Sequence, residues 1–112
     1  MISVIWIIAI INSVNFIDNM DGLAAVVSGS ICLQIAFLSN YLNQYKLTDI
    51  SLLLLATIIG FFIFNYPPAK LYLGDSGSLF IGFFISFMTI DLYNSFNIHP
   101  DFCINICSWF LY

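Results

Sequence analysis

The sequence predicts an all-α protein: a polytopic transmembrane helix bundle of about four to five spans, at ~20 residues for each span. Of its 112 residues, 62% are hydrophobic and only 7% are charged, whereas soluble proteins carry about 25% charged residues. The apolar residues form continuous runs rather than an alternating pattern, which favours helices over a membrane β-barrel. We therefore treat residues 1–112 as one membrane-embedded segment.

Apolar runs separated by polar residues give the expected helices. In chain order they are Met1–Val14, Gly22–Leu42, Leu52–Tyr66 (extended towards membrane length by Thr48–Ser51), Ser78–Leu92 and Asp101–Tyr112. The first run is typical of the end of a helix and the last of the beginning of one. The runs between them are at or slightly below the length of a span. Because neither end has a signal-peptide pattern or an anchoring charge, we expect a fragment of a larger protein.

Basic residues are scarce in this chain. Lys46 and Lys70 are the only ones, so no basic patch exists to neutralise a phosphate backbone, and no nucleic-acid partner is expected. One lysine falls on each side of the predicted membrane, so the distribution of positive charge does not orient the chain. For Lys70, an extended side chain that reaches the membrane surface is favoured over a contact with phosphate.

Three aspartates stand at the edges of apolar runs. Asp18 and Asp21 lie in the segment Asn15–Gly22, and Asp75 lies in Gly74–Ser78. A carboxylate at the edge of a membrane span is costly unless it faces water, a metal or a partner, so such residues are candidates for a functional site. Two spans separate the segments and return the chain to its starting side. The three acids are therefore predicted to lie at one membrane surface.

The spacing of Asp18 and Asp21 places both on one face of a helix or turn. Two nearby carboxylates repel each other, and the pKa of one rises unless a cation or hydrogen-bond donors lie between them. A divalent metal or a polar substrate would remove that cost. The alternative is that the acids cap the helix beginning at Gly22, where they complement the helix dipole. For Asp21 alone, both interpretations remain open.

Asp75 is surrounded by small residues at a predicted helix start. Gly74 and Gly77 allow tight backbone turns and the close approach of a ligand. Free amides at a helix start favour phosphate, and Mg²⁺ is often shared between a carboxylate and phosphate oxygens. The alternative is an ordinary polar turn. Nearby, Asn65 fits a metal-bound group or a helix cap, and Tyr72 fits a stacked base or an interfacial anchor.

Small residues recur every four positions at Ser78, Gly82 and Ser86. This pattern lets another helix approach closely within a membrane. We interpret it as a packing surface and assign it no chemistry.

Asn15–Ala24 and Asn65–Ser78 resemble two segments of the polyprenyl-phosphate N-acetylhexosamine-1-phosphate transferases. The first matches the family pattern Asn-x-x-Asp-x-x-Asp-Gly-Leu-Ala, and the second matches Asn-x-x-Pro-Ala…Gly-Asp-x-Gly-Ser. Neither segment is decisive alone, but both together, in this order and two spans apart, are specific. The visible departure is Asn19, where many members have glycine.

The resemblance implies a multi-pass enzyme of the plasma (inner) membrane with cytoplasmic active-site loops. It would use Mg²⁺, or Mn²⁺ in its place. Its substrates would be a UDP-N-acetylhexosamine and a polyprenyl phosphate, which it would convert into a polyprenyl-diphosphate-linked sugar and UMP for cell-envelope polysaccharides. The residues around Asp75 resemble the GlcNAc branch of the family more than the muramoyl-pentapeptide branch.

The resemblance also implies roles for individual residues. The metal ligand is Asp75, the catalytic acids on the nucleotide and pyrophosphate side are Asp18 and Asp21, and the substrate-binding residues are Asn15, Asn65 and Tyr72. The family's upstream Asp-Asp pair and downstream His-containing loop have no counterpart here, and His99 is not a match. We therefore expect the chain to cover about the middle third of a member and to be inactive alone, since catalytic groups act as a unit.

Two other classes of protein compete with the transferase. A small transport or ion-binding membrane protein would use intramembrane acids to bind cations, and a structural subunit would use them only as caps. A transporter would place its acids near the bilayer midplane, whereas the transferase needs them at one surface. The predicted spans carry no acid near their middle, since Asp91 falls near the far end of Ser78–Leu92, and this favours the transferase.

Overall fold

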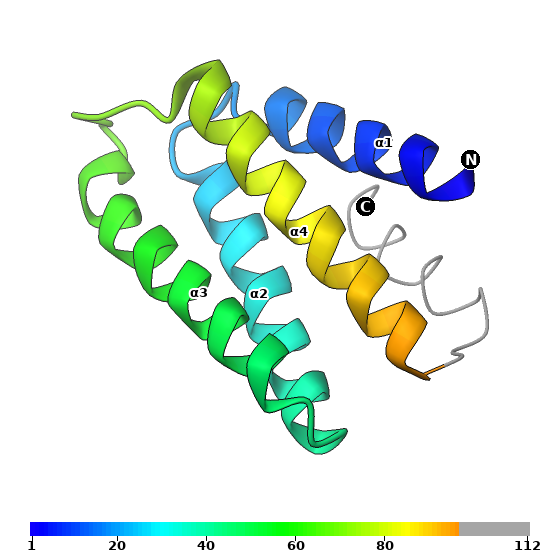
Figure 1. Cartoon of the computed structure of the whole chain (residues 1–112). Helices are drawn as coiled ribbons and strands as arrows, with labels where there is room; N and C mark the ends of the chain where they lie inside the picture. The colour runs from blue at the N-terminus through cyan, green and yellow to red at the C-terminus, as the bar shows by residue number, and fades with distance from the viewer. Residues whose placement is uncertain (97–112) are drawn as a thin grey trace.

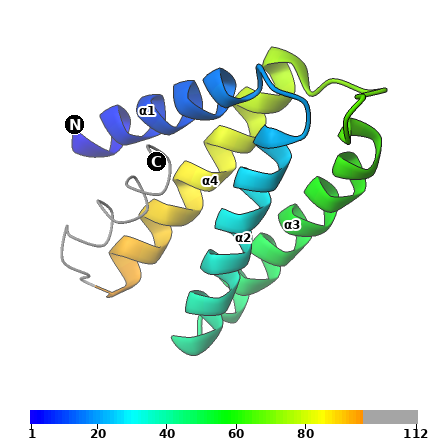
Figure 2. The same ribbon diagram turned by 180° about the vertical axis from the view of Figure 1, so that it is seen from behind.

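The computed structural model describes residues 1–96, which form four helices joined by short loops (Figures 1 and 2). The helices are α1 (Ile2–Ile17), α2 (Leu23–Tyr41), α3 (Tyr45–Asn65) and α4 (Gly74–Phe96). No strand occurs among the described residues, so the predicted all-α class is confirmed. The fifth apolar run, Asp101–Tyr112, lies outside them.

Three of the helices are long and apolar enough to cross a membrane. They are α2 with 19 residues, α3 with 21, and the Gly74–Asn94 part of α4 with 21. Helix α1 is equally apolar but shorter, at 16 residues. Large hydrophobic side chains on these helices, including Phe37, Leu53 and Phe83, point outwards and are exposed. An apolar exterior of this kind suits a lipid environment, so the chain is a membrane protein.

Helices α1, α3 and α4 extend beyond one or both ends of the apolar runs that predict them, whereas α2 (Leu23–Tyr41) matches its run to within one residue at each end. Helix α1 continues past Val14 to Ile17, so Asn15 lies in a helix. Helix α4 begins at Gly74, which puts Asp75 in its first turn. Helix α3 begins at Tyr45 rather than at Thr48. Hydropathy marks only the part of a helix that suits hydrocarbon, whereas the terminal turns at a membrane surface tolerate polar residues.

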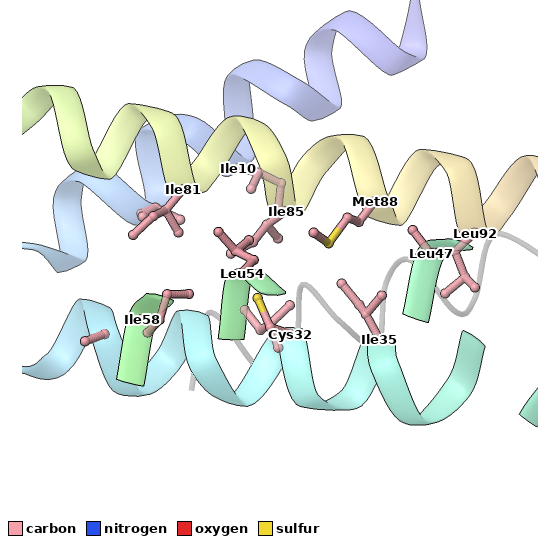
Figure 3. Packing of buried hydrophobic residues seen from close by; sticks show 13 residues of the cluster. Ile10, Cys32, Ile35, Leu47, Leu54, Ile58, Ile81, Ile85, Met88 and Leu92 are labelled. Carbon is pink, nitrogen blue, oxygen red and sulfur yellow. The ribbon is translucent and has the colours of Figure 1, made fainter. Parts of the chain in front are cut away.

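The helices pack in two pairs: α1 lies along α4, and α2 lies along α3 (Figure 1). Helix α2 also contacts α4, which joins the pairs. Figure 3 shows the apolar side chains that meet between them. The central members are Ile10 of α1, Cys32 and Ile35 of α2, Leu54 and Ile58 of α3, and Ile85 and Met88 of α4. Within a membrane such contacts stabilise mainly through close packing.

The predicted small-residue stripe is the contact surface of α4 with α1. A Cβ atom added to Gly82 would lie only 2.8 Å from the Cα of Ile11. Ser78 and Ser86, one turn to either side, are fully buried. The packing interpretation is therefore confirmed: the absence of a side chain at Gly82 lets the two backbones approach.

Polar side chains inside the bundle are paired with one another. The indole N–H of Trp6 donates to Thr89 Oγ1 over 3.0 Å and links α1 to α4. The hydroxyls of Ser39 and Thr48 lie 2.8 Å apart and link α2 to α3. No buried side-chain nitrogen or oxygen of the described residues lacks a hydrogen-bond partner. These pairs remove the cost of placing polar groups in an apolar interior.

Candidate active site

The polar segments singled out in the sequence meet at one end of the bundle, the upper end in Figures 1 and 2. Helix α1 ends and α4 begins there, and two loops join them: residues 18–22 between α1 and α2, and residues 66–73 between α3 and α4. Hydrogen bonds described below connect these parts directly. The segments of Asp18, Asp21 and Asp75 therefore lie at a common end of the bundle, as the two crossings between them predict.

Asn15 connects the last turn of α1 to the first turns of α4. Its side-chain amide nitrogen donates to Asp75 Oδ1 over 3.3 Å and to Ser78 Oγ over 2.9 Å. The Ser78 hydroxyl in turn donates to the Asp75 carbonyl over 3.0 Å. The Asp75 carboxylate is exposed, but one of its oxygens is held by this network. The other oxygen has no hydrogen bond from this network and is free to meet a ligand.

Asp18 is the residue at which α1 ends, and its backbone N–H donates to the Val14 carbonyl over 3.1 Å. Partial burial raises the pKa of its carboxyl, and the negative charge of Asp75 raises this pKa further. Both effects disfavour the ionised carboxylate. Asp18 and Asp75 are therefore close enough to repel each other, and a cation placed beside both would stabilise the ionised pair.

A hydrogen bond of Asp21 connects the 18–22 loop to the 66–73 loop. Its Oδ2 accepts a hydrogen bond from the backbone N–H of Ala69 at 3.3 Å, and the side chain is otherwise exposed. The residue at the N-cap of α2 is Gly22, and no side chain makes a capping hydrogen bond there. The structure therefore does not show the helix-cap alternative for Asp21.

Asn65 is buried where α3 ends, with 4% of its surface exposed. Its Oδ1 accepts a hydrogen bond from the Gly22 N–H at 2.8 Å, and its Nδ2 donates to the Leu71 carbonyl at 2.7 Å. Both polar atoms of this amide thus bind backbone of the two loops. The role in substrate binding that the resemblance implies for Asn65 stays a prediction, and it has to be compatible with these two bonds.

Gly22 fits this junction for two reasons. Its φ of +76° is in the left-handed region, which side-chain-bearing residues rarely adopt. A Cβ added there would also lie 3.2 Å from Phe62 Cε2 and 3.6 Å from Pro67 Cδ. The glycine of the Asp-Gly pair therefore allows α2 to start directly beneath the 66–73 loop.

Tyr72 stands on the surface of the 66–73 loop, with 71% of its area exposed. The loop folds back on α3, because the backbone N–H groups of Lys70 and Leu71 both donate to the Phe64 carbonyl, over 3.0 and 3.3 Å. An exposed ring on a tethered loop can stack on a flat ligand such as a nucleobase.

The acids do not form a closed metal cage. Among residues 1–96, no three His, Cys, Asp or Glu side chains come together in an arrangement that could hold a metal. The carboxylates of Asp18 and Asp75 are hard oxygen donors, however, and the charge of Asp75 acts on Asp18. Mg²⁺ is usually held by one or two carboxylates, with water and substrate phosphate completing its shell. The donor set fits Mg²⁺ shared with a phosphate.

Three residues of the quoted motif segments, Gly22, Leu71 and Ser78, take part in this site although the sequence assigned them no role in it. Ser78 was assigned to helix packing, but its hydroxyl also bonds Asn15. Gly22 and Leu71 take part through their backbone N–H and carbonyl groups, which every such residue has, so residue type does not identify them. The available signal for Ser78 was its position three residues after Asp75, one helical turn away.

The described residues form a helical membrane bundle in which two polar motif segments are joined at one end. Residues 1–93 match glycosyl transferase family 4, and the chain belongs to this family.

Relatives within the family share this region. The chain is 39% identical over 95 residues to a probable undecaprenyl-phosphate N-acetylglucosaminyl 1-phosphate transferase of Bacillus subtilis, an alignment covering 84% of this chain and 26% of the relative. It is similar to two phospho-N-acetylmuramoyl-pentapeptide-transferases. The Wolinella succinogenes protein is 44% identical over 104 residues (80% of this chain, 30% of the relative), and the Lactococcus lactis protein is 36% identical over 90 residues (80% and 27%).

The chain thus spans between a quarter and a third of the length of these relatives. No solved structure matches it.

Proposed function

We propose that these residues form part of the active site of a polyprenyl-phosphate N-acetylhexosamine-1-phosphate transferase. The substrates are a UDP-N-acetylhexosamine and a polyprenyl phosphate, and the products are a polyprenyl-diphosphate-linked sugar and UMP. The names of the Bacillus and Lactococcus relatives support this class of reaction. Because the chain spans about a quarter of those relatives, the proposal concerns the activity that these residues support within a full-length family member.

The observation that carries the proposal is the joining of both motif segments by hydrogen bonds at one end of the bundle. Asn15 binds Asp75, and Asp21 binds the loop that follows α3. These contacts support a site in which the carboxylates lie at the same end of the bundle as the loop of Tyr72, an end that we propose lies at the membrane surface. A lipid phosphate and a water-soluble nucleotide sugar can meet only at such a surface. The alternative cation transporter requires acids deeper in the spans.

The reaction is a phosphoryl transfer between anions. An oxygen of the polyprenyl phosphate attacks the β-phosphorus of the UDP-sugar, the bond from that phosphorus to the bridging oxygen breaks, and UMP leaves with the electron pair. Such reactions depend mainly on positioning and on neutralising negative charge. Bound Mg²⁺ supplies that neutralisation, and Asp75, held in place by Asn15, is its proposed ligand.

The remaining residues act on the nucleotide side of the site. Asp18 and Asp21, in the 18–22 loop, are proposed to orient the pyrophosphate and nucleotide, directly or through the metal. Tyr72 is proposed to stack on the uracil, since its ring is exposed on the neighbouring loop. We propose that these loops face the cytoplasm, on the side where nucleotide sugars are made.

A segment exchange tests the proposal. The matching segment of the Bacillus subtilis relative is replaced by residues 1–93 of this chain, and the chimera is expressed in membranes. UMP release is then measured with polyprenyl phosphate, Mg²⁺ and either UDP-GlcNAc or UDP-MurNAc-pentapeptide. We expect transfer from one of these donors, and a loss of about 100- to 1000-fold in kcat for Asp75→Asn.

Asp91→Asn is the matched control, because Asp91 is an exposed acid on the same helix, outside the site. Its activity should equal that of the unsubstituted chimera. A chimera that inserts stably but transfers nothing from either donor would refute the proposed function, as would transfer that survives Asp75→Asn.

A further inference from the structure

Two loops of the site are held together by one buried side chain. The Oδ1 of Asn65 binds the N–H of Gly22 in the 18–22 loop, and its Nδ2 binds the carbonyl of Leu71 in the 66–73 loop. These loops carry Asp21 and Tyr72, two of the residues proposed to bind the nucleotide. Asn65 is only 4% exposed, and each polar atom of its amide already has a backbone partner, so the side chain presents little surface to a substrate.

The two hydrogen bonds of Asn65 fix the position of the 18–22 loop relative to the 66–73 loop. Each is short, at 2.8 and 2.7 Å, and each partner is a backbone group that would otherwise be unpaired at a helix start or in a loop. The side-chain amide of asparagine accepts through its oxygen and donates through its nitrogen, whereas an ionised carboxylate can only accept. Asn65 therefore fits a clamp between two loops better than an acid would.

The clamp acts one residue away from the proposed base-binding ring. Leu71 precedes Tyr72, whose side chain makes little contact with the rest of the protein and is 71% exposed. The direction of that ring is therefore determined mainly by the backbone on which it stands. On the other loop, the Asp21 carboxylate is held only by the Ala69 N–H at 3.3 Å, a long bond that reinforces the same loop pairing.

We propose that Asn65 is a positioning residue for nucleotide binding: it clamps the 18–22 loop to the 66–73 loop, and so aims Tyr72 at the base without touching the substrate itself. This inference rests on the proposed function for the identity of the ligand. The clamp itself is independent of that function and is tested separately.

The clamp is tested by single-residue amide hydrogen exchange on the full chain in lipid nanodiscs. Asn65→Leu, of similar size, removes both bonds, so the amides of Gly22 and of residues 69–71 should exchange faster while the helix centres keep their protection. Asn65→Asp keeps the acceptor for Gly22 but loses the donor to Leu71, so residues 69–71 should exchange faster while Gly22 stays protected. Asn12→Leu is the matched control, because Asn12 bonds only to Ile8 within its own helix.

The positioning role is tested with the chimera by a double-mutant cycle of Asn65→Leu and Tyr72→Ala. We expect each single change to raise the KM for the UDP-sugar about tenfold, with the KM for the lipid unchanged. The double variant should be no worse than Tyr72→Ala, because Asn65 acts through Tyr72. KM effects that multiply in the double variant would overturn the proposal and assign Asn65 an independent contact with substrate.

A failure of the proposed function and a failure of the Asn65 clamp give different results. If the unsubstituted chimera transfers nothing, the proposed function fails, while hydrogen exchange still reports on the clamp. If Asn65→Asp leaves exchange at residues 69–71 unchanged, the clamp is wrong whatever the chimera does. If Asn65→Leu alters all helices equally, Asn65 is a general stability residue and the proposal is also overturned.

Discussion

The side-chain nitrogen of Asn15 lies 3.3 Å from the Oδ1 of Asp75, although the two residues are 60 positions apart. One belongs to the last turn of α1 and the other to the first turn of α4. The same nitrogen lies 2.9 Å from the Ser78 hydroxyl. The two motif segments are therefore parts of one hydrogen-bonded unit, and the orientation of the proposed metal ligand depends on a residue of the other motif.

Replacing Asn15 by leucine should weaken metal binding in the chimera. Without its amide, the Asp75 carboxylate loses the donor that orients it. Loss of a residue that supports a metal ligand typically costs 10- to 100-fold in metal affinity, so the Mg²⁺ concentration for half-maximal transfer should rise by roughly that factor. Asn12→Leu, one turn away on α1, should leave the Mg²⁺ titration unchanged. An unaltered Mg²⁺ titration for Asn15→Leu would show that Asn15 does not support metal binding.

Asp18→Asn should stabilise the protein at neutral pH. The pKa of Asp18 is raised in the folded chain by burial and then by Asp75, so folding disfavours its ionised form. This penalty is absent below the unfolded-state pKa of about 3.9, and it develops as the pH rises through the folded-state value. The variant should therefore melt at a higher temperature than the parent at pH 7, and the two should converge at low pH.

Thermal unfolding in detergent micelles across that pH range checks this prediction. A lower melting temperature for Asp18→Asn at pH 7 would mean that the carboxylate is stabilised in the fold, contrary to the burial described. In the chimera the same change should reduce transfer, as expected where a site tolerates a destabilising charge for function.

Gly82→Ala and Gly60→Ala should have opposite effects on stability. A methyl group at Gly82 would lie 2.8 Å from the Cα of Ile11, which forces α1 away from α4. Overpacking of this kind costs about 1–3 kcal/mol. At Gly60, also helical, no heavy atom lies within 4 Å of the added carbon, and alanine should stabilise the helix by roughly 0.5–1 kcal/mol. Denaturant titration of both variants measures the difference; equal effects would contradict the α1–α4 contact.

Cysteine labelling should report opposite sides for the two ends of the bundle. Asn40 and Ser76 are exposed, at the end of α2 and the start of α4. In a background with Cys32, Cys103 and Cys107 changed to alanine, Asn40→Cys should react with a membrane-impermeant reagent on intact cells. Ser76→Cys should react only after permeabilisation. The reverse pattern would refute the proposed cytoplasmic loops, and labelling of both from one side would refute the crossing of α3, the one helix between the two positions.

The arrangement of helices could be predicted because it depends on properties that residues carry individually. Continuous apolar runs indicate membrane helices, and two crossings between Asp21 and Asp75 return the chain to the same side. The helix ends were less accessible: Asn15 and Asp75 lie in terminal turns where polarity and helix coexist. Motif resemblance included Asn65 and Gly22 but not the bonds of Asn65, because Gly22 and Leu71 contribute backbone atoms, whose partners sequence patterns do not reveal.

The pairing of α1 with α4, and of α2 with α3, has a consequence for biosynthesis. Helices α2 and α3 are neighbours in the chain and can associate as a hairpin as soon as α3 leaves the ribosome. Helix α1 emerges first but must wait for α4, the last of the four, before Trp6 and Asn15 meet Thr89 and Asp75. Until α4 is inserted, the indole N–H of Trp6 lacks its partner Thr89, and it is during this interval that α1 most needs protection by the insertion machinery.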